Sequence, residues 1–349
     1  LNVLNCTIDL RTGKPRPHNR DDLITKLAPV EFDPHAETPL WTAVLARVMD
    51  GRDNLVGYLQ RIAGLCLTGD ASEQELYILF GGGANGKSVF IDTITGILGD
   101  YACEAASSLL TIGMHEQHPT EVADLCGRRL VVGSETEEGA RFRVSLIKRL
   151  TGNARLKARY MRQDFFEFPR THKLLIATNN RPSVRETSHA IWRRIRLIPF
   201  DVTIPDNEQD HRLLDKLRGE WPGILKWAIE GCLAWQRDGM QAPSEVLVAT
   251  EEYQAEQDPL AEFFAAKCLV GPDLKASRTE LFAGYQQWVK ASGEQHPLER
   301  NAFYDHVRRV PGVSETMLRM NNKPTRVWTG IGIMDLSTEY QHATSSVTA

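Results

Sequence analysis

A glycine-rich run between residues 81 and 88 combines the residue types that bind phosphate groups. The run GGGANGKS follows the apolar segment LYILF and ends in Gly86, Lys87 and Ser88. In such a loop the backbone N–H groups surround the phosphates, the lysine reaches the outer ones, and the serine hydroxyl takes a magnesium ligand position. The run therefore predicts a nucleoside triphosphate site with Mg²⁺, formed by Gly81, Gly82, Gly83, Ala84, Asn85, Gly86, Lys87, Ser88 and Val89.

The same glycines also match G-x-G-x-x-G, the pattern of dinucleotide-binding folds. Such a fold needs an acidic residue about 20 positions further on, at the end of a second strand, to hold the ribose. The segment from Glu104 to Ser108 (EAASS) does not have a strand-like sequence. The triphosphate interpretation is therefore favoured.

Two later apolar segments would bring polar side chains to this loop. Residues 129–133 are followed by Glu135 and Glu137, and residues 173–178 are followed by Asn179. Triphosphate hydrolysis needs carboxylates to hold Mg²⁺ and to orient water. We expect Glu135 to join Ser88 at the metal and Asn179 to contact the γ-phosphate or the water. Which of the two glutamates is the base stays open.

The charge distribution along the chain indicates a polyanionic partner. The net charge is −4, yet residues 141–196 carry 15 Lys/Arg against 3 Asp/Glu, between two acidic flanks. A compact basic block of this kind favours a polyanion held at one place on the surface.

Composition is that of an ordinary globular protein of more than one domain, 42% hydrophobic and 25% charged. The sequence has no export signal and no apolar run of membrane-spanning length, and its six cysteines are scattered without a C-x-x-C pair. We expect a protein of the reducing cytoplasm, without a membrane partner. Because the chain opens on Leu1, we also expect it to be part of a longer protein.

The pattern of apolar segments predicts an α/β fold with several parts. We expect a linker near Pro272, and after it two helices and a strand pair, which is the pattern of a winged-helix domain. The expected parts are an N-terminal strand and helical collar region (1–72), a P-loop core (73–200), an acidic helical segment (201–270), a winged-helix domain (271–335) and a flexible tail (336–349).

Several stretches together resemble one family, the phage and plasmid primase-helicases of helicase superfamily 3. The resemblance runs from Leu1 to about Ile333 and rests on motifs that occur in order. They are LNVLNCTIDLRTG, GGGANGKS, RRLVVGSETEEGARF, LTGNARLKARYMRQDFFEFPRTHKLLIATNNRP, AIWRRIRLIPF, WPGILKWAIEGCLAW and RVWTGIGI.

The resemblance implies an AAA+ ATPase core, a parallel sheet flanked by helices, that assembles as a ring, commonly a hexamer, around DNA. It implies ATP and Mg²⁺ as cofactors, an upstream primase domain, and movement on single-stranded DNA at a fork, usually 3′ to 5′. Lys87, Glu135, Glu137 and Asn179 fall on the catalytic motifs. In many relatives the two acidic residues are adjacent, whereas here Thr136 separates them. Arg193 and Arg194 match the position of an arginine finger given to a neighbouring subunit, and which of them acts stays open.

Family members also carry a hairpin that points into the ring channel, between the acidic motif and the sensor. The corresponding stretch here holds residues suited to backbone phosphates and to a splayed base. They are Arg155, Lys157, Arg159, Tyr160 and Arg162. In the predicted winged-helix domain, two interpretations stay open: duplex binding through Arg308, Arg309, Lys323 and Arg326, or protein docking.

Two other functions remain possible from the sequence. A small-molecule phosphotransferase would not respond to DNA, and it leaves the basic block unexplained. A replication-initiation protein that uses ATP as an assembly switch would form nucleotide-dependent oligomers with little turnover.

Overall fold

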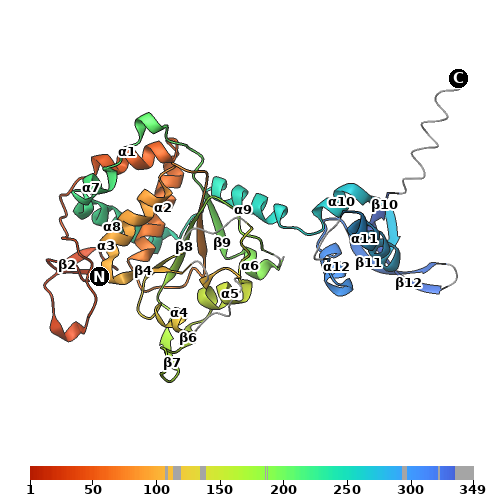
Figure 1. Ribbon diagram of the computed structural model, residues 1–349, viewed down its shortest axis with the longest axis horizontal. Helices are drawn as coiled ribbons and strands as arrows, with labels where there is room; N and C mark the ends of the chain where they lie inside the picture. Colours follow the sequence, from red (N-terminus) through yellow and green to blue (C-terminus); the bar gives the residue numbers. More distant parts are fainter. Residues whose placement is uncertain are drawn as a thin grey trace. The chain divides into compact units, whose positions relative to one another are not determined.

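The computed structural model describes residues 1–106, 109–112, 119–133, 139–184, 186, 188–292, 297–320 and 323–334 (Figure 1). The chain forms two compact units, which meet in the sequence between Gln254 and Ala255. Within the described ranges, no helix has the length and apolar character needed to cross a membrane.

The first unit is built on a five-stranded sheet in the order β4-β5-β8-β3-β9, with every neighbouring pair parallel. The strand β3 lies between β8 and β9, so both of its edges are hydrogen-bonded. The strands are β3 (Leu76–Phe80), β4 (Ala102–Ala105), β5 (Leu130–Gly133), β8 (Lys173–Thr178) and β9 (Ile195–Pro199). The predicted strand at residues 76–80 is confirmed, and so is the α/β class.

Helices cover both faces of this sheet, as a parallel sheet requires. Along β3, Tyr77 and Leu79 enter one hydrophobic core while Leu76 and Ile78 enter another, because successive side chains point to opposite faces. The first core is covered by α1 (Pro39–Val48), α2 (Asp53–Cys66), α3 (Lys87–Leu98), α7 (Leu213–Arg218) and α8 (Trp221–Asp238). The second is covered by α4 (Pro119–Ala123), α5 (Val144–Gly152), α6 (His189–Trp192) and α9 (Ser244–Glu256) (Figure 1).

In the described part of the first unit, two antiparallel strand pairs lie outside the main sheet. One is β1 (Thr7–Asp9) with β2 (Lys14–Arg16), near the N-terminus. The other is β6 (Arg155–Ala158) with β7 (Phe166–Pro169), which is the hairpin expected from the sequence. Short 3-10 turns occur at Arg20–Asp22, Gly99–Tyr101 and Asp206–Glu208.

The expectation that the chain after Glu104 is not a strand was partly wrong, because Ala102–Ala105 forms β4. This short strand pairs with β5 alone and lies at the far edge of the sheet. In a dinucleotide-binding fold the acid-bearing strand lies beside the strand that precedes the glycine loop. Here β5 and β8 separate β4 from β3. The strand order thus gives a firmer argument against a dinucleotide fold than the sequence did.

The second unit, from Ala255 onward, has its own aromatic core around Phe263, Tyr285, Phe303 and Trp328. Its elements are α10 (Ala261–Lys267), β10 (Cys268–Ser277), α11 (Arg278–Ser292), α12 (Arg300–Val307), β11 (Ser314–Met320) and β12 (Lys323–Ile333). The three strands form an antiparallel sheet in the order β10-β12-β11. The two helices and the β11–β12 pair lie where the sequence predicts them, and the winged-helix assignment remains a prediction.

Pro272, where we expected a linker, lies inside β10. The pairing of β10 with β12 shifts register between Val270 and Lys275. A bulge of this kind accommodates a proline, which has no N–H group for the ladder. The linker expectation at this residue was therefore wrong, and the division between compact units falls near the end of α9.

Candidate nucleotide-binding site

The glycine-rich loop joins the carboxyl end of β3 to the start of α3 and leaves little room for side chains. A Cβ atom on Gly81 would lie 2.1 Å from the carbonyl oxygen of Phe200, the residue after β9. Gly86 has φ +84°, in the left-handed region, and a Cβ there would lie 2.6 Å from Cγ1 of Val48. These glycines let the loop pack closely between β9 and α1, with α3 starting at Lys87.

The Lys87 side chain is buried and turns back onto its own loop. Its Nζ donates to the carbonyl oxygens of Gly81 (2.7 Å) and Gly82 (3.0 Å) and to Oδ1 of Asn85 (3.0 Å). It also donates to Oδ1 of Asn179 at 2.9 Å. The structure therefore brings together Lys87 and Asn179, which lie 92 positions apart in the sequence.

The loop lines a cavity of about 250 Å³ at the carboxyl edge of the sheet. Lys87 and Ser88 come from the loop and α3, Val132 from β5, and Ala177 and Asn179 from the end of β8. Gly83, Ala84, Asn85, Ile91 and Asp92 complete the lining. A positive lysine, a hydroxyl and an amide around one loop fit a phosphate chain and a divalent ion.

Asp92 is a lining residue that the sequence analysis did not single out. It lies four positions after Ser88 on α3, so the helical repeat places the two side chains on one face. The four-residue spacing from Ser88 is the sequence signal that could have identified Asp92. Burial, and then the carboxylate of Glu104 on β4, raise the pKa of Asp92.

Glu135 and Glu137 lie outside the described residues. The strand before them, β5, ends at Gly133, which pairs with Ile176 of β8. Since the two strands are parallel, the chain leaves β5 at the same edge of the sheet as Asn179.

A second cavity, of about 410 Å³, lies on the α1 side of the loop. Ala84, Gly86 and Val89 form one wall, and the apolar residues Leu40, Ala43, Val44 and Val48 of α1 form another. Residues from 204 to 213 close it, and among them are His211 and Asp210. This cavity is mostly apolar with polar groups at its margin, as nucleobase sites are.

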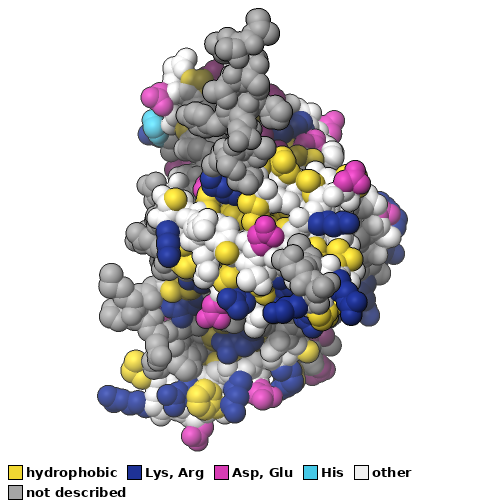
Figure 2. Space-filling view, turned by 90° about the vertical axis from the view of Figure 1, so that its right-hand side faces the viewer, with side chains coloured by type: hydrophobic (Ala, Val, Ile, Leu, Met, Phe, Trp, Pro, Cys, Tyr) yellow, Lys and Arg dark blue, Asp and Glu magenta, His cyan; other side chains and the backbone are white. Residues whose placement is uncertain are grey.

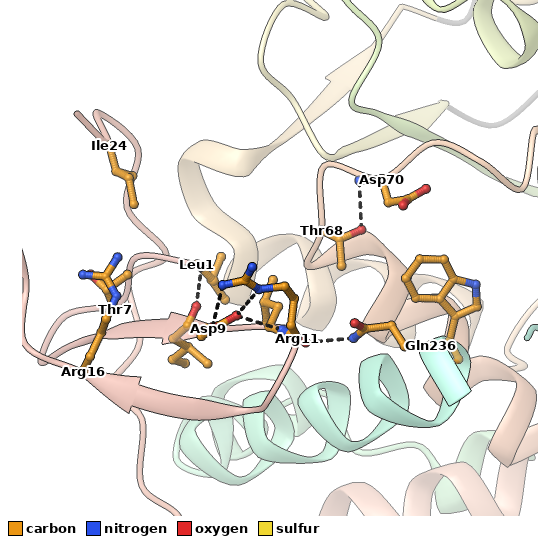
Figure 3. Close-up of a pocket in the computed structure, with 12 residues that line it drawn as sticks. Leu1, Thr7, Asp9, Arg11, Arg16, Ile24, Thr68, Asp70 and Gln236 are labelled. Atoms are coloured by element: carbon orange, nitrogen blue, oxygen red, sulfur yellow. Dashed lines mark hydrogen bonds and ion pairs between the residues drawn. The ribbon is translucent and has the colours of Figure 1, made fainter. Parts of the chain in front are cut away.

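A third cavity, also of about 410 Å³, lies beside the β1–β2 pair and α8 (Figure 3). Polar side chains around it are engaged locally: Arg11 forms an ion pair with Asp9 at 3.0 Å, and Gln236 donates to the Leu10 carbonyl oxygen at 2.8 Å (Figure 3). The residues around it come from the N-terminal segment, the turn after α2, and α8, and we assign no ligand to it.

The two candidate finger arginines differ sharply in environment. Arg194 is 8% exposed, and its Nε donates to Oγ1 of Thr151 at 3.1 Å, while another guanidinium nitrogen donates to the carbonyl oxygen of Ala190. Burial, and then the charge of Arg193, lower the pKa of Arg194. Arg193 is exposed at the end of α6. Neighbours in sequence, the two residues thus face different surroundings.

The β6–β7 hairpin separates its apolar and basic residues by strand alternation. Leu156 pairs with Phe168 and Ala158 with Phe166, and their side chains lie toward the second core. Lys157 pairs with Glu167 on the opposite, exposed face. Arg155 also lies on this face and forms an ion pair with Glu167 at 3.5 Å. The alternation places the basic residues outward.

Arg159, Tyr160 and Arg162 follow β6 at the exposed end of the hairpin. The Tyr160 ring stacks on Phe166, with centroids 5.5 Å apart, and its hydroxyl donates to the Ala123 carbonyl oxygen of α4 at 3.4 Å. Lysine and arginine side chains gather at the lower end of the face shown in Figure 2, at the height of this hairpin in Figure 1.

Two family models match parts of this chain. The model "D5 N terminal like" matches residues 1–50, and "Family of unknown function (DUF5906)" matches residues 79–194, which include the loop, the hairpin and both arginines.

Two curated relatives of this chain are viral proteins. "Putative helicase L207/L206" of Acanthamoeba polyphaga mimivirus is 24% identical over 82% of this chain and 32% of its own length. "Putative primase C962R" of African swine fever virus (isolate Warthog) is 24% identical over 77% of this chain and 30% of its own length. The resemblance to primase-helicases is confirmed. This chain spans about a third of the length of the curated relatives it matches.

A solved structure shares the fold. The apo structure of the NrS-1 C-terminal region (residues 305–718) has a TM-score of 0.52 and 11% identity, and the match covers 86% of this chain and 78% of that one. At this identity the likeness concerns the fold alone.

The contrast between the two arginines predicts unequal effects on stability. Arg194→Ala removes a buried guanidinium and its hydrogen bonds, so we expect it to lower the free energy of unfolding by about 2–3 kcal/mol. Arg193→Ala, at an exposed position, should stay within about 0.5 kcal/mol of the wild type. Urea unfolding of the two variants provides the comparison. Equal stability of the two variants would contradict the structural role of Arg194.

Proposed function

We propose that this chain is the ATP-driven motor part of a primase-helicase, which unwinds duplex DNA by moving along single-stranded DNA as a ring. The observation that carries the proposal is the contact of Lys87 with Asn179 at the mouth of the loop cavity. This contact supports a phosphate-binding site in which the residue after β8 contacts the same phosphate group as the glycine-rich loop. The names of the viral relatives, helicase and primase, support DNA replication as the context.

The lining of the loop cavity fits ATP and Mg²⁺. The loop N–H groups and Lys87 would hold the phosphates, while the Ser88 hydroxyl and Glu135 would hold Mg²⁺. A bound Mg²⁺ ion would neutralise negative charge on the phosphate oxygens. One glutamate of the pair Glu135 and Glu137 would orient the attacking water, and Asn179 would hold the γ-phosphate.

Lys87 must change partners when a phosphate chain enters this cavity. Its Nζ now contacts two loop carbonyl oxygens and two amide oxygens. Phosphate oxygens attract an ammonium group more strongly than neutral carbonyl groups do. The exchange would remove the Lys87 contact from the Asn179 amide oxygen, which links the end of β8 to the nucleotide state.

The nucleobase would lie in the apolar cavity on the α1 side of the loop. Gly86 and Val89 border this cavity, and Ala84 lines both it and the loop cavity. One ligand can therefore occupy both, with its phosphates at Lys87 and its base against α1.

Arg193 would complete the site of a neighbouring subunit, since it is exposed whereas Arg194 is engaged within its own subunit. A guanidinium placed at the transferred phosphate stabilises charge in the transition state. The proposed ring contact is heterologous, with one surface bearing the loop and another bearing Arg193. The basic hairpin would face the DNA in the channel.

Mixed oligomers test the site and the ring together. Lys87→Ala and Arg193→Ala subunits should each lack ATP hydrolysis, because one loses the phosphate contact and the other the finger. In oligomers that contain both, an Arg193→Ala subunit with an intact loop can receive Arg193 from a Lys87→Ala neighbour. We expect about a quarter of the wild-type rate per subunit if the two kinds are present in equal numbers and placed at random in a heterologous ring.

The measurement uses two affinity tags, one on each variant, and purification through both tags after co-expression. Oligomers of Lys87→Ala subunits with two tags are the matched control. Co-purified mixed oligomers that remain as inactive as either variant alone would contradict action across the subunit boundary.

A larger side chain in the apolar cavity on the α1 side of the loop tests whether this cavity holds the nucleobase. Ala43 lies on α1 and lines the cavity, whereas Ala46 is exposed on the same helix outside the lining residues. Ala43→Phe should raise KM for ATP about tenfold or more, because the ring takes the space of the base. Competition by inorganic tripolyphosphate should not change. If Ala43→Phe has the same KM for ATP as the Ala46→Phe control and the wild type, the nucleobase does not bind in this cavity.

A further inference from the structure

The end of the β6–β7 hairpin presents large apolar side chains to solvent. Phe165 is 51% exposed and Met161 is 66% exposed, whereas the next two phenylalanines are partly buried (Phe166) and buried (Phe168). Arg162, between them, has φ +60°, which makes a tight turn at the tip.

Strand alternation places Phe165 on the same face as the basic residues. Phe166 pairs with Ala158 on the buried face, so Phe165 belongs to the opposite face, with Lys157 and Glu167. The Nζ of Lys157 lies 5.3 Å from the centroid of the Phe165 ring, and the guanidinium carbon of Arg159 lies 4.9 Å from it. Two cations therefore flank one exposed ring.

Tyr160, the other aromatic residue near the tip, is engaged within the unit. Its ring stacks on Phe166 at an interplanar angle of 21°, and its hydroxyl reaches α4. Tyr160 braces the hairpin, whereas Phe165 has no strand partner across from it among the paired residues of β6 and β7.

We propose that Phe165 is a stacking platform for an unpaired base of single-stranded DNA, with Lys157 and Arg159 contacting the phosphates on either side of that base. The inference rests on the proposed DNA-motor function and names the aromatic residue of its DNA contact. An exposed ring offers a π-face that any base can cover, and neighbouring cations neutralise the backbone at the same place. The contact is therefore tolerant of sequence, which suits a protein that moves along a strand.

Equilibrium binding distinguishes a base contact from a phosphate contact. The probes are a fluorescently labelled oligo-dT and an abasic oligonucleotide of the same length, which has the same phosphates but no bases. Phe165→Ala should weaken oligo-dT binding roughly five-fold to a hundred-fold, the range for loss of one stacked base. Its salt dependence should equal that of the wild type. On the abasic strand, Phe165→Ala and wild type should bind alike.

Two matched variants complete the experiment. Phe165→Trp keeps an aromatic face and should retain oligo-dT affinity. Lys157→Ala should weaken binding to both oligonucleotides and reduce the slope of log affinity against log salt by about one phosphate contact.

The outcomes distinguish failure of the proposed DNA-motor function from failure of the Phe165 stacking role. A wild type that binds neither oligonucleotide overturns the proposed function, and the inference with it. A wild type that binds oligo-dT while Phe165→Ala binds it equally well, or loses the same factor on the abasic strand, overturns the stacking role alone. A Phe165→Ala chain that loses its oligomeric state in sedimentation would show instead that the ring packs on a neighbouring subunit.

Discussion

The parallel pairing of β3 with β8 is the constraint on which the candidate site depends. The register sets Phe80 opposite Thr178, so the residues that follow the two strands, the glycine-rich loop and Asn179, emerge side by side. The pairing has few alternatives, since a slip of either strand by one residue would exchange the side chains that it gives to the two cores. Burial of the sheet on both sides thus fixes the distance from Lys87 to Asn179, and that distance defines the site.

The same strand links the nucleotide site to the hairpin. β7 ends at Pro169 and β8 begins at Lys173, so three residues join the two elements. This junction is anchored: Arg170 N–H donates to the Ala154 carbonyl oxygen, and the Lys173 ammonium group donates to the Asp70 carbonyl oxygen at 3.2 Å. Burial, as the largest cause, lowers the pKa of His172 to about 3 and that of Lys173 to about 7. A shift of Asn179 toward a γ-phosphate would therefore move the hairpin through a short, packed connection. In the proposed motor, this connection couples the nucleotide site to the β6–β7 hairpin.

Much of this arrangement was accessible from sequence, because long apolar runs bounded by glycine or polar residues leave few alternatives. The strands at residues 76–80 and 173–178 and the loop between β3 and α3 follow directly from such patterns. β4 was missed because four residues at a sheet edge, ACEA, carry no clear alternation. β10 was missed because Gly271 and Pro272 resemble a linker, and a bulge that accommodates them has no signature in sequence.

The different environments of Arg193 and Arg194 could not be predicted for a related reason. Adjacent residues of one type give no pattern, and only the packing of Arg194 against Thr151 distinguishes them. The exposure of Phe165 is similar: in the run FFEF, alternation says that one phenylalanine faces away from the others, but not whether another element covers it. Residue types and their spacing predict the chemistry of the loop. The burial of individual polar and aromatic side chains depends on elements distant along the chain and could not be predicted.

The central claim is that ATP hydrolysis in this chain serves work on DNA, and the most direct test is hydrolysis with Mg²⁺ in the absence and presence of single-stranded DNA. Our account predicts turnover that single-stranded DNA accelerates. Turnover indifferent to DNA would contradict it in favour of a small-molecule phosphotransferase. Nucleotide-dependent assembly with no turnover, with or without DNA, would contradict it in favour of an ATP-operated assembly switch.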